Sequence, residues 1–154
     1  MSARLIDFDE FENLTTSILK NGQMVRFTAH GSSMHPFIQD GDVVEVHQTK
    51  PDGLIPGDVV LARLFDGRLV VHRVIRIFAD NILIQGDSLI CPDGMIHLSN
   101  VLGQVDVISR QGKRIPFDSL NMKSFSRFLL IKQLSRNLFH RVTQRIRRTI
   151  SALK

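Results

Sequence analysis

The 154-residue chain contains no tryptophan, no tyrosine and a single cysteine, Cys91. One cysteine cannot form an internal disulfide, which excludes a disulfide framework and is typical of a reducing compartment. We expect Cys91 to be a small buried hydrophobic residue rather than a reactive thiol. The ten phenylalanines supply all of the aromatic packing. The length and the ordinary composition predict one globular domain with a substantial core.

The chain also lacks any run of about 20 apolar residues, the length that a membrane-spanning helix needs. Asp7, Asp9, Glu10 and Glu12 occupy the region where a secretory signal peptide would have basic and then apolar residues. We therefore expect a cytoplasmic protein without a transmembrane segment, with the inner face of the membrane as a possible peripheral site.

Acidic residues are missing from the end of the chain. Residues 121–154 contain nine basic residues and no acidic residue, whereas residues 1–120 carry a net charge of −4. An apolar stripe at helical spacing runs through this part, with arginines on the other faces. The stripe consists of Ile131, Leu134, Leu138, Val142, Ile146 and Ile150.

This basic amphipathic tail has three interpretations. It lies on an anionic membrane surface, it packs its apolar stripe on the body or on a partner, or it binds nucleic acid. The charge pattern favours the membrane surface. We expect no nucleic-acid binding, because no aromatic interleaving or base-reading pattern accompanies the basic residues.

The rest of the chain is predicted to be mainly β. Residues 6–20 form a helix, because apolar residues recur there at helical spacing and Asn21-Gly22 ends the pattern. Alternating residues and Gly or Asp turns predict seven or eight short antiparallel strands after it. The predicted strands are 23–29, 43–48, 59–65, 68–78, 82–85 and 101–109, with a last short one after Lys113, and Cys91 to Gly94 is predicted to be a loop. We divide the chain into an N-terminal helix (1–22), a β domain (23–118) and a helical tail (119–154).

One stretch suggests chemistry, namely Gly31-Ser32-Ser33-Met34-His35-Pro36. It predicts a tight bend that starts at a glycine and lies at the edge of the sheet. A hydroxyl is exposed at such a bend, and backbone N–H groups converge beside it. We interpret Ser33 as a nucleophile.

A serine needs a neighbouring base near neutral pH, and His72 is the candidate. It lies among valines in mid-strand, where a histidine is costly unless it is hydrogen-bonded. Such a histidine is more often a satisfied core residue, but the serine bend favours a general base with a reference pKa of about 6.5. Asp87 and Asp93 lie in the loop after the next strand, and either can orient the imidazole.

Four ordered motifs within residues 24–108 resemble those of the type I signal peptidases. They are Ser-Met-x-Pro followed by Gly-Asp, then Gly-Asp-Val-Val, His-Arg-Val, and Gly-Asp-x5-Asp. A histidine in the third motif is similar to the endoplasmic-reticulum and archaeal type, whereas bacterial members have a lysine. The resemblance implies a serine endopeptidase on an antiparallel β domain that is shared with the self-cleaving domains of SOS-response repressors.

The resemblance makes Ser33 the nucleophile, His72 the general base and Asp93 its orienter, with Asp87 as a supporting acid. The Ser33 N–H would donate to the oxyanion. Gly31 stands where some members have a hydroxyl that helps to bind it. The other supporting residues from the motifs are Gly31, Ser32, Met34, Pro36, Arg73 and Gly86.

The chain departs from the signal peptidases in three ways. An acidic amphipathic helix replaces the usual N-terminal membrane anchor, Ser88 replaces the usual asparagine after Gly-Asp, and a basic tail is added. It departs from the SOS repressors as well, since it has His72 instead of lysine and no Ala-Gly dipeptide to cut, and we expect it to have no DNA-binding domain.

We therefore expect a signal-peptidase-like serine endopeptidase that cleaves a precursor protein or peptide bound as an extended strand. We expect no metal or organic cofactor. Two alternatives stay open: a regulatory protein that cleaves itself, and a non-catalytic β module whose tail docks on a membrane or a partner.

Overall fold

The computed structural model describes residues 8–117. One helix, α1 (Phe8–Lys20), precedes an antiparallel sheet of eight strands. The strands are β1 (Val25–Thr28), β2 (Val43–His47), β3 (Val59–Arg63), β4 (Leu69–Ile77), β5 (Asn81–Gln85), β6 (Gly94–His97), β7 (Val101–Arg110) and β8 (Lys113–Pro116). Two short 3₁₀ helices, η1 (Pro51–Gly53) and η2 (Leu98–Asn100), lie in the connections.

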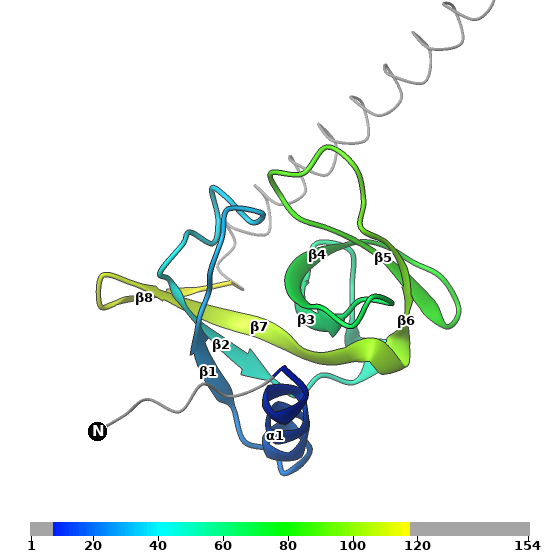
Figure 1. Cartoon of the computed structure of the whole chain (residues 1–154), viewed down its shortest axis with the longest axis horizontal. Coiled ribbons are helices and arrows are strands. Elements are labelled where there is room, and N and C mark those ends of the chain that lie inside the picture. The colour runs from blue at the N-terminus through cyan, green and yellow to red at the C-terminus, as the bar shows by residue number, and fades with distance from the viewer. Residues whose placement is uncertain (1–7, 118–154) are drawn as a thin grey trace, which may run out of the picture.

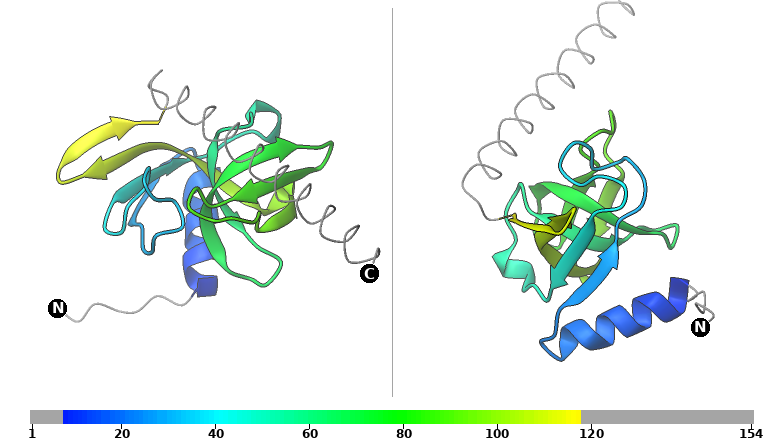
Figure 2. Two further views of the ribbon diagram at one scale, coloured as in Figure 1. Left: turned by 90° about the horizontal axis from the view of Figure 1, so that it is seen from above. Right: turned by 90° about the vertical axis from the view of Figure 1, so that its left-hand side faces the viewer.

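The long strand β7 connects two halves of the sheet (Figure 1). The strand order is β1-β2-β7-β3-β4-β5-β6, and β8 also pairs with β7. Thus β7 lies between β2 on one side and β3 on the other, although it follows both by more than 35 residues in sequence. The sheet is strongly curved, and β3 to β6 wrap away from the β1-β2-β7-β8 half (Figure 2).

The curvature creates two hydrophobic clusters. The first is built mainly from β1, β2, β7 and the β1–β2 loop, and it includes Val44, Val46 and Ile108. The second lies between β3, β4, β5 and β6, and it includes Val60, Ile82 and Ile84. Strand β4 contributes to both clusters, since Val71 packs against the first and the adjacent Val70 packs against the second. Consecutive side chains of β4 therefore point to opposite sides, as the alternation of a strand requires.

Helix α1 packs against β7 through a position that only glycine can fill. Leu19 is 1 % exposed, and a Cβ on Gly103 would lie 3.1 Å from its Cδ1 and 2.5 Å from the His47 carbonyl oxygen. The 2.5 Å distance to a backbone oxygen is too short for a real Cβ, and the 3.1 Å distance to Leu19 is tighter than most side-chain contacts. At its other end, α1 is tied to β3 by an ion pair of 3.5 Å between Glu12 and Arg63.

The predicted mainly β class, with a helix before the sheet, is confirmed. Strand β6 was not predicted, because its four residues follow directly on a loop sequence and Gly94 begins it. The expectation that Cys91 is buried is wrong: its thiol is exposed. The Cys91 loop leads into β6, which is an edge strand. No further strand of the described sheet therefore lies beside this loop to cover the thiol. The predicted tail helix lies outside the described residues.

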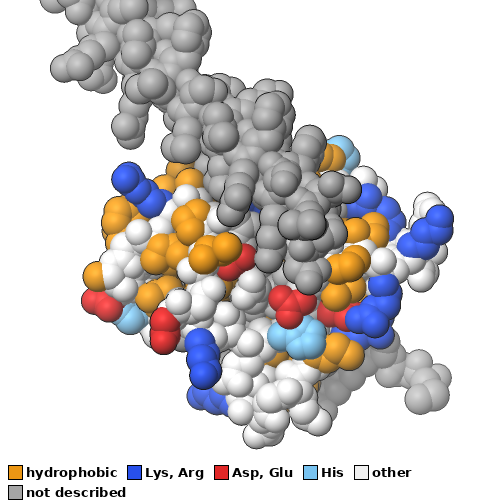
Figure 3. Space-filling view, turned by 180° about the vertical axis from the view of Figure 1, so that it is seen from behind, with side chains coloured by type: hydrophobic (Ala, Val, Ile, Leu, Met, Phe, Trp, Pro, Cys, Tyr) orange, Lys and Arg blue, Asp and Glu red, His pale blue; other side chains and the backbone are white. Residues whose placement is uncertain are grey.

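The surface carries charged side chains of both signs. A space-filling view from behind shows acidic, basic and hydrophobic groups interspersed on one face (Figure 3). Within residues 8–117, no helix has the length and apolarity needed to cross a membrane.

Candidate active site

The predicted nucleophile lies in the loop between β1 and β2. Two backbone bonds close the base of this loop, from the Ala29 N–H to the Asp42 carbonyl oxygen (2.7 Å) and from the Gly41 N–H to the Ala29 carbonyl oxygen (2.9 Å). Gly31 has a φ of 93°, which a residue with a Cβ rarely adopts, and its N–H donates to Asp40 Oδ1 (2.8 Å). The loop is thus folded on itself before it reaches Ser33.

Met34, directly after the serine pair, anchors the loop in the core. Met34 is buried (4 % exposed) in the first hydrophobic cluster, and Pro36 is exposed after a cis peptide bond with His35. Ser32 is exposed, whereas Ser33 is half-buried. Anchoring by Met34 therefore turns the Ser33 side chain toward the sheet and leaves Ser32 outside.

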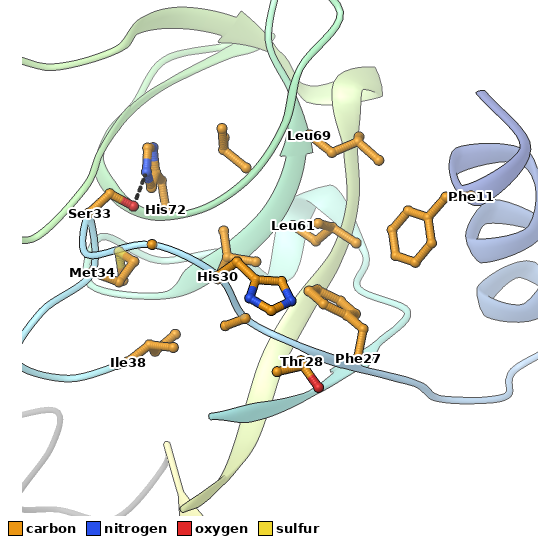
Figure 4. Close-up of a pocket in the computed structure, with 14 residues that line it drawn as sticks. Phe11, Phe27, Thr28, His30, Ser33, Met34, Ile38, Leu61, Leu69 and His72 are labelled. Carbon is orange, nitrogen blue, oxygen red and sulfur yellow. Dashed lines mark hydrogen bonds between the residues drawn. The ribbon is translucent and has the colours of Figure 1, made fainter. Parts of the chain in front are cut away.

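Ser33 Oγ lies 3.0 Å from Nε2 of His72 (Figure 4). His72 stands in the middle of β4, opposite Val60 of β3, and it is only 4 % exposed. The two residues are 39 positions apart in the chain. A hydroxyl and an imidazole nitrogen at this distance can exchange a proton directly.

The other ring nitrogen of His72 faces a carboxylate. Nδ1 lies 2.7 Å from Oδ2 of Asp93, whose side chain is 13 % exposed. Within residues 8–117 neither of these two atoms has another hydrogen-bond partner. Asp93 is fixed in turn by its backbone N–H, which donates to the Ile84 carbonyl oxygen on β5 (3.0 Å). Of the two acids that the sequence left open, Asp93 is therefore the one beside His72.

Burial sets the protonation of the base. Desolvation lowers the pKa of His72 below its ordinary value of 6.5, and this effect outweighs the opposing influence of the Asp93 carboxylate, which raises the pKa. His72 is therefore neutral at physiological pH. A neutral imidazole can accept a proton from the serine, which a protonated one cannot.

Asp87 pairs with Arg73 instead of His72. The guanidinium donates through Nε to Oδ1 (2.7 Å) and through Nη2 to Oδ2 (2.6 Å), and both side chains are nearly inaccessible to solvent. Nη1 of Arg73 donates to the Gly57 carbonyl oxygen (2.7 Å). The guanidinium also stacks on Phe37 and Phe117, with its carbon 5.0 and 5.8 Å from the ring centroids.

The neighbours of Asp87 hold the serine backbone. The Ser88 N–H donates to the Ser33 carbonyl oxygen (2.8 Å), and Ser88 Oγ lies 2.8 Å from the Ser32 carbonyl oxygen and 3.0 Å from that of Ser33. On the other side of Asp87, a Cβ on Gly86 would lie 2.7 Å from the Ser33 carbonyl oxygen. The two backbones therefore touch where Gly86 has no side chain.

A candidate donor for an oxyanion lies beside the serine hydroxyl. Among the described residues, no acceptor is bonded to the Ser33 N–H. Gly31 has no hydroxyl to add to it. Residue 31 therefore offers no side-chain donor, and the Ser33 N–H is the candidate backbone donor for an oxyanion.

Sequence reasoning missed three groups at this site. The hydroxyl of Ser88 holds the serine loop, the Gly57 carbonyl oxygen accepts from Arg73, and Phe37 and Phe117 enclose the guanidinium. The sequence carried a signal for the first two groups, because Gly57 begins the Gly-Asp-Val-Val motif and Ser88 directly follows the Gly-Asp dipeptide at 86–87. Nothing in the sequence indicated the two phenylalanines.

In the described part of the chain, no three histidine, cysteine, aspartate or glutamate side chains are grouped as metal ligands. The polar groups of the site instead form a serine–histidine–aspartate series. Such a series is the arrangement of a serine hydrolase.

The comparison with protein families agrees with this class. The family described as Peptidase S24-like matches residues 4–106, which is more than half of the chain. The chain belongs to the S24-like peptidase family. Comparison with curated proteins gave no match.

The close contact at Gly86 can be tested with a pair of glycine substitutions. We expect Gly86→Ala to lower the kcat of peptide cleavage by at least about tenfold. The new methyl group displaces the Ser33 backbone, and a small misplacement of a reacting group lowers the reaction rate strongly. Gly53→Ala is the matched control, since a Cβ there meets nothing within 4 Å and the glycine has no positive φ. Equal kcat values for the two variants would contradict the proposed contact.

The buried ion pair can be tested by urea unfolding. Asp87→Ala leaves the Arg73 guanidinium buried without its carboxylate, and we expect the free energy of unfolding to fall by about 3–5 kcal/mol. Asp66→Asn is the control, because Asp66 pairs with Arg68 at the surface, where an ion pair contributes little. If both variants unfold at the same urea concentration as the unchanged chain, the Arg73–Asp87 pair does not stabilise the fold.

Proposed function

We propose that the protein is a serine endopeptidase in which Ser33 is the nucleophile, His72 the general base and Asp93 the residue that orients the base. The observation that carries the proposal is the continuous series of two short contacts, 3.0 Å from Ser33 to His72 and 2.7 Å from His72 to Asp93. Membership of the S24-like peptidases supports it.

In the first step, Ser33 Oγ attacks the carbonyl carbon of a peptide bond while His72 Nε2 takes the hydroxyl proton. The Asp93 carboxylate stabilises the imidazolium that forms and keeps the Nδ1 proton on its side of the ring. The negative charge moves to the substrate oxygen, where the Ser33 N–H is positioned to donate to it.

In the second half of the reaction, the proton on Nε2 passes to the nitrogen of the leaving amine as the C–N bond breaks. An ester between Ser33 and the substrate remains. His72, again neutral, then takes a proton from water, and the hydroxide adds to the ester carbonyl. Return of the proton to Ser33 Oγ releases the acid product and restores the site.

We further propose that the substrate is an extended segment of a precursor protein or peptide, as in the signal peptidases. Among the described strands, β1 pairs only with β2, so its other edge has free backbone groups. This edge leads directly into the loop that carries Ser33. An extended peptide that adds to β1 as a further strand would be delivered to the nucleophile.

The assignment of the nucleophile and the base is tested with a precursor-cleavage assay read by mass spectrometry. Ser33→Ala and His72→Ala should each lower kcat by about 10⁴-fold or more, since members of such a series act as a unit. Ser32→Ala is the matched control and should keep most of the activity, because Ser32 is exposed beside the site. Full turnover by the Ser33 or His72 variant would refute the assignment.

The same assay distinguishes cleavage of another chain from self-cleavage. Mass analysis of the purified protein should show an intact chain, with products arising only from added precursor. A discrete internal cut that is absent in Ser33→Ala would instead identify the self-cleaving repressor type of activity.

The pH profile tests the role of Asp93. Because the base must be neutral, kcat/KM should fall with decreasing pH, and the midpoint should lie below pH 6.5, since burial lowers the pKa of His72. Asp93→Asn removes a charge that raises this pKa, so the midpoint should move further down while the rate decreases. Asp52→Asn, in η1, is the control and should leave the midpoint in place. A midpoint that is the same in Asp93→Asn as in the unchanged chain would rule out this role.

A further inference from the structure

A cavity of about 400 Å³ opens beside the Ser33–His72 pair. It extends from this pair, along β1, β3 and β4, to helix α1 (Figure 4). Fourteen described residues line it, and none of them is acidic, lysine or arginine. Its far end is formed by three large hydrophobic side chains, Phe11, Phe27 and Leu69 (Figure 4).

Helix α1 supplies the far wall through Phe11. The Phe11 ring meets the Phe27 ring edge-on, with the centroids 5.6 Å apart and an angle of 88° between the planes. The next residue, Glu12, is paired with Arg63 of β3, and Leu19 is buried against β7. These contacts fix the helix, so that Phe11 is held in place as part of the cavity.

We infer that this cavity binds a bulky apolar side chain of the substrate, such as leucine, methionine or phenylalanine, and that Phe11 determines this specificity. The inference rests on the proposed peptidase function and names its substrate more closely. A charged substrate side chain would lose its hydration in the cavity without gaining a partner of opposite charge.

The size of the cavity argues against a small side chain. The methyl group of an alanine is about the size of a water molecule, which takes up about 30 Å³, and it would leave most of the cavity unfilled. A bulky hydrophobic side chain can reach the Phe11, Phe27 and Leu69 end. In an extended peptide, alternate side chains point to the same face, so one substrate can place a side chain here while its backbone lies at Ser33.

The test begins with binding rather than cleavage, so that it does not depend on catalysis. The Ser33→Ala chain is titrated with fluorescent peptides of alanine, serine and threonine in which one position at a time carries leucine, phenylalanine, alanine or glutamate. We expect the leucine or phenylalanine peptide at one position to bind at least about tenfold more tightly than its alanine or glutamate counterpart.

Substitutions in α1 locate the source of this preference. Phe11→Ala, in the Ser33→Ala chain, should remove the tenfold preference, and Phe11→Leu should restore part of it. Leu14→Ala is the matched control, because Leu14 is a large hydrophobic residue on the same helix that is 49 % exposed and does not line the cavity. Leu69→Ala, at the same end of the cavity but on β4, should act like Phe11→Ala and serves as the second variant if Phe11→Ala does not fold.

The outcomes separate the two proposals. A preference for bulky side chains that disappears in Phe11→Ala and persists in Leu14→Ala supports the inference, whether or not the unchanged chain cleaves the peptide. Preferred binding without cleavage by the unchanged chain refutes the peptidase and leaves the pocket. Cleavage or binding without any such preference, a preference for alanine, or no binding of any peptide overturns the inference.

Discussion

The buried ion pair between Arg73 and Asp87 connects the strand that carries the base to the loop that holds the nucleophile. Arg73 follows His72 on β4, and Asp87 stands between Gly86 and Ser88, both of which meet the Ser33 carbonyl oxygen. Two charges out of water need excellent geometry and additional hydrogen bonds. Here the bidentate contact, the Gly57 carbonyl oxygen and the two phenylalanine rings provide them. The pair therefore links the strand that carries His72 to the loop that contacts the Ser33 backbone.

The two aspartates of the site have different roles. Asp87 is fully engaged by a guanidinium, so it serves the structure of the loop. Asp93 lies directly against the imidazole, so its charge acts on the base more strongly than that of Asp87. Without Asp87 the Arg73 guanidinium would lose its carboxylate, and without Asp93 the His72 imidazole would lose the carboxylate that faces it. Since both belong to one loop, the seven residues from Asp87 to Asp93 carry the support for the nucleophile and the support for the base.

Much of the architecture could be predicted from the sequence, because alternating residues and Gly or Asp turns mark most strands directly. Strand β6 could not, since its four residues have no clear alternation and its pairing with β5 is a tertiary effect.

The Ser33–His72–Asp93 arrangement could be anticipated from the order of the motifs. The choice between Asp87 and Asp93 could not be made from composition or spacing alone, because it depends on which acid a buried arginine occupies. The cavity was also not predictable, since its residues come from α1, β1, β3, β4 and the serine loop and meet only in three dimensions.

The position of β7 in the sheet has a consequence for how the protein becomes functional during folding. Its sequence neighbours β6 and β8 lie at an edge and off the main path, while β7 itself pairs with β2 and β3, which come much earlier in the chain. The strands that flank Ser33 and the strand that carries His72 belong to different halves, and their sheet pairing is completed through β7. Contacts this distant in sequence are made late and slowly. Ser33 and His72 are synthesised before β7, and Asp93 precedes it by only eight residues, so the peptide-cutting geometry can be completed only when the strand that joins the two halves of the sheet has been made.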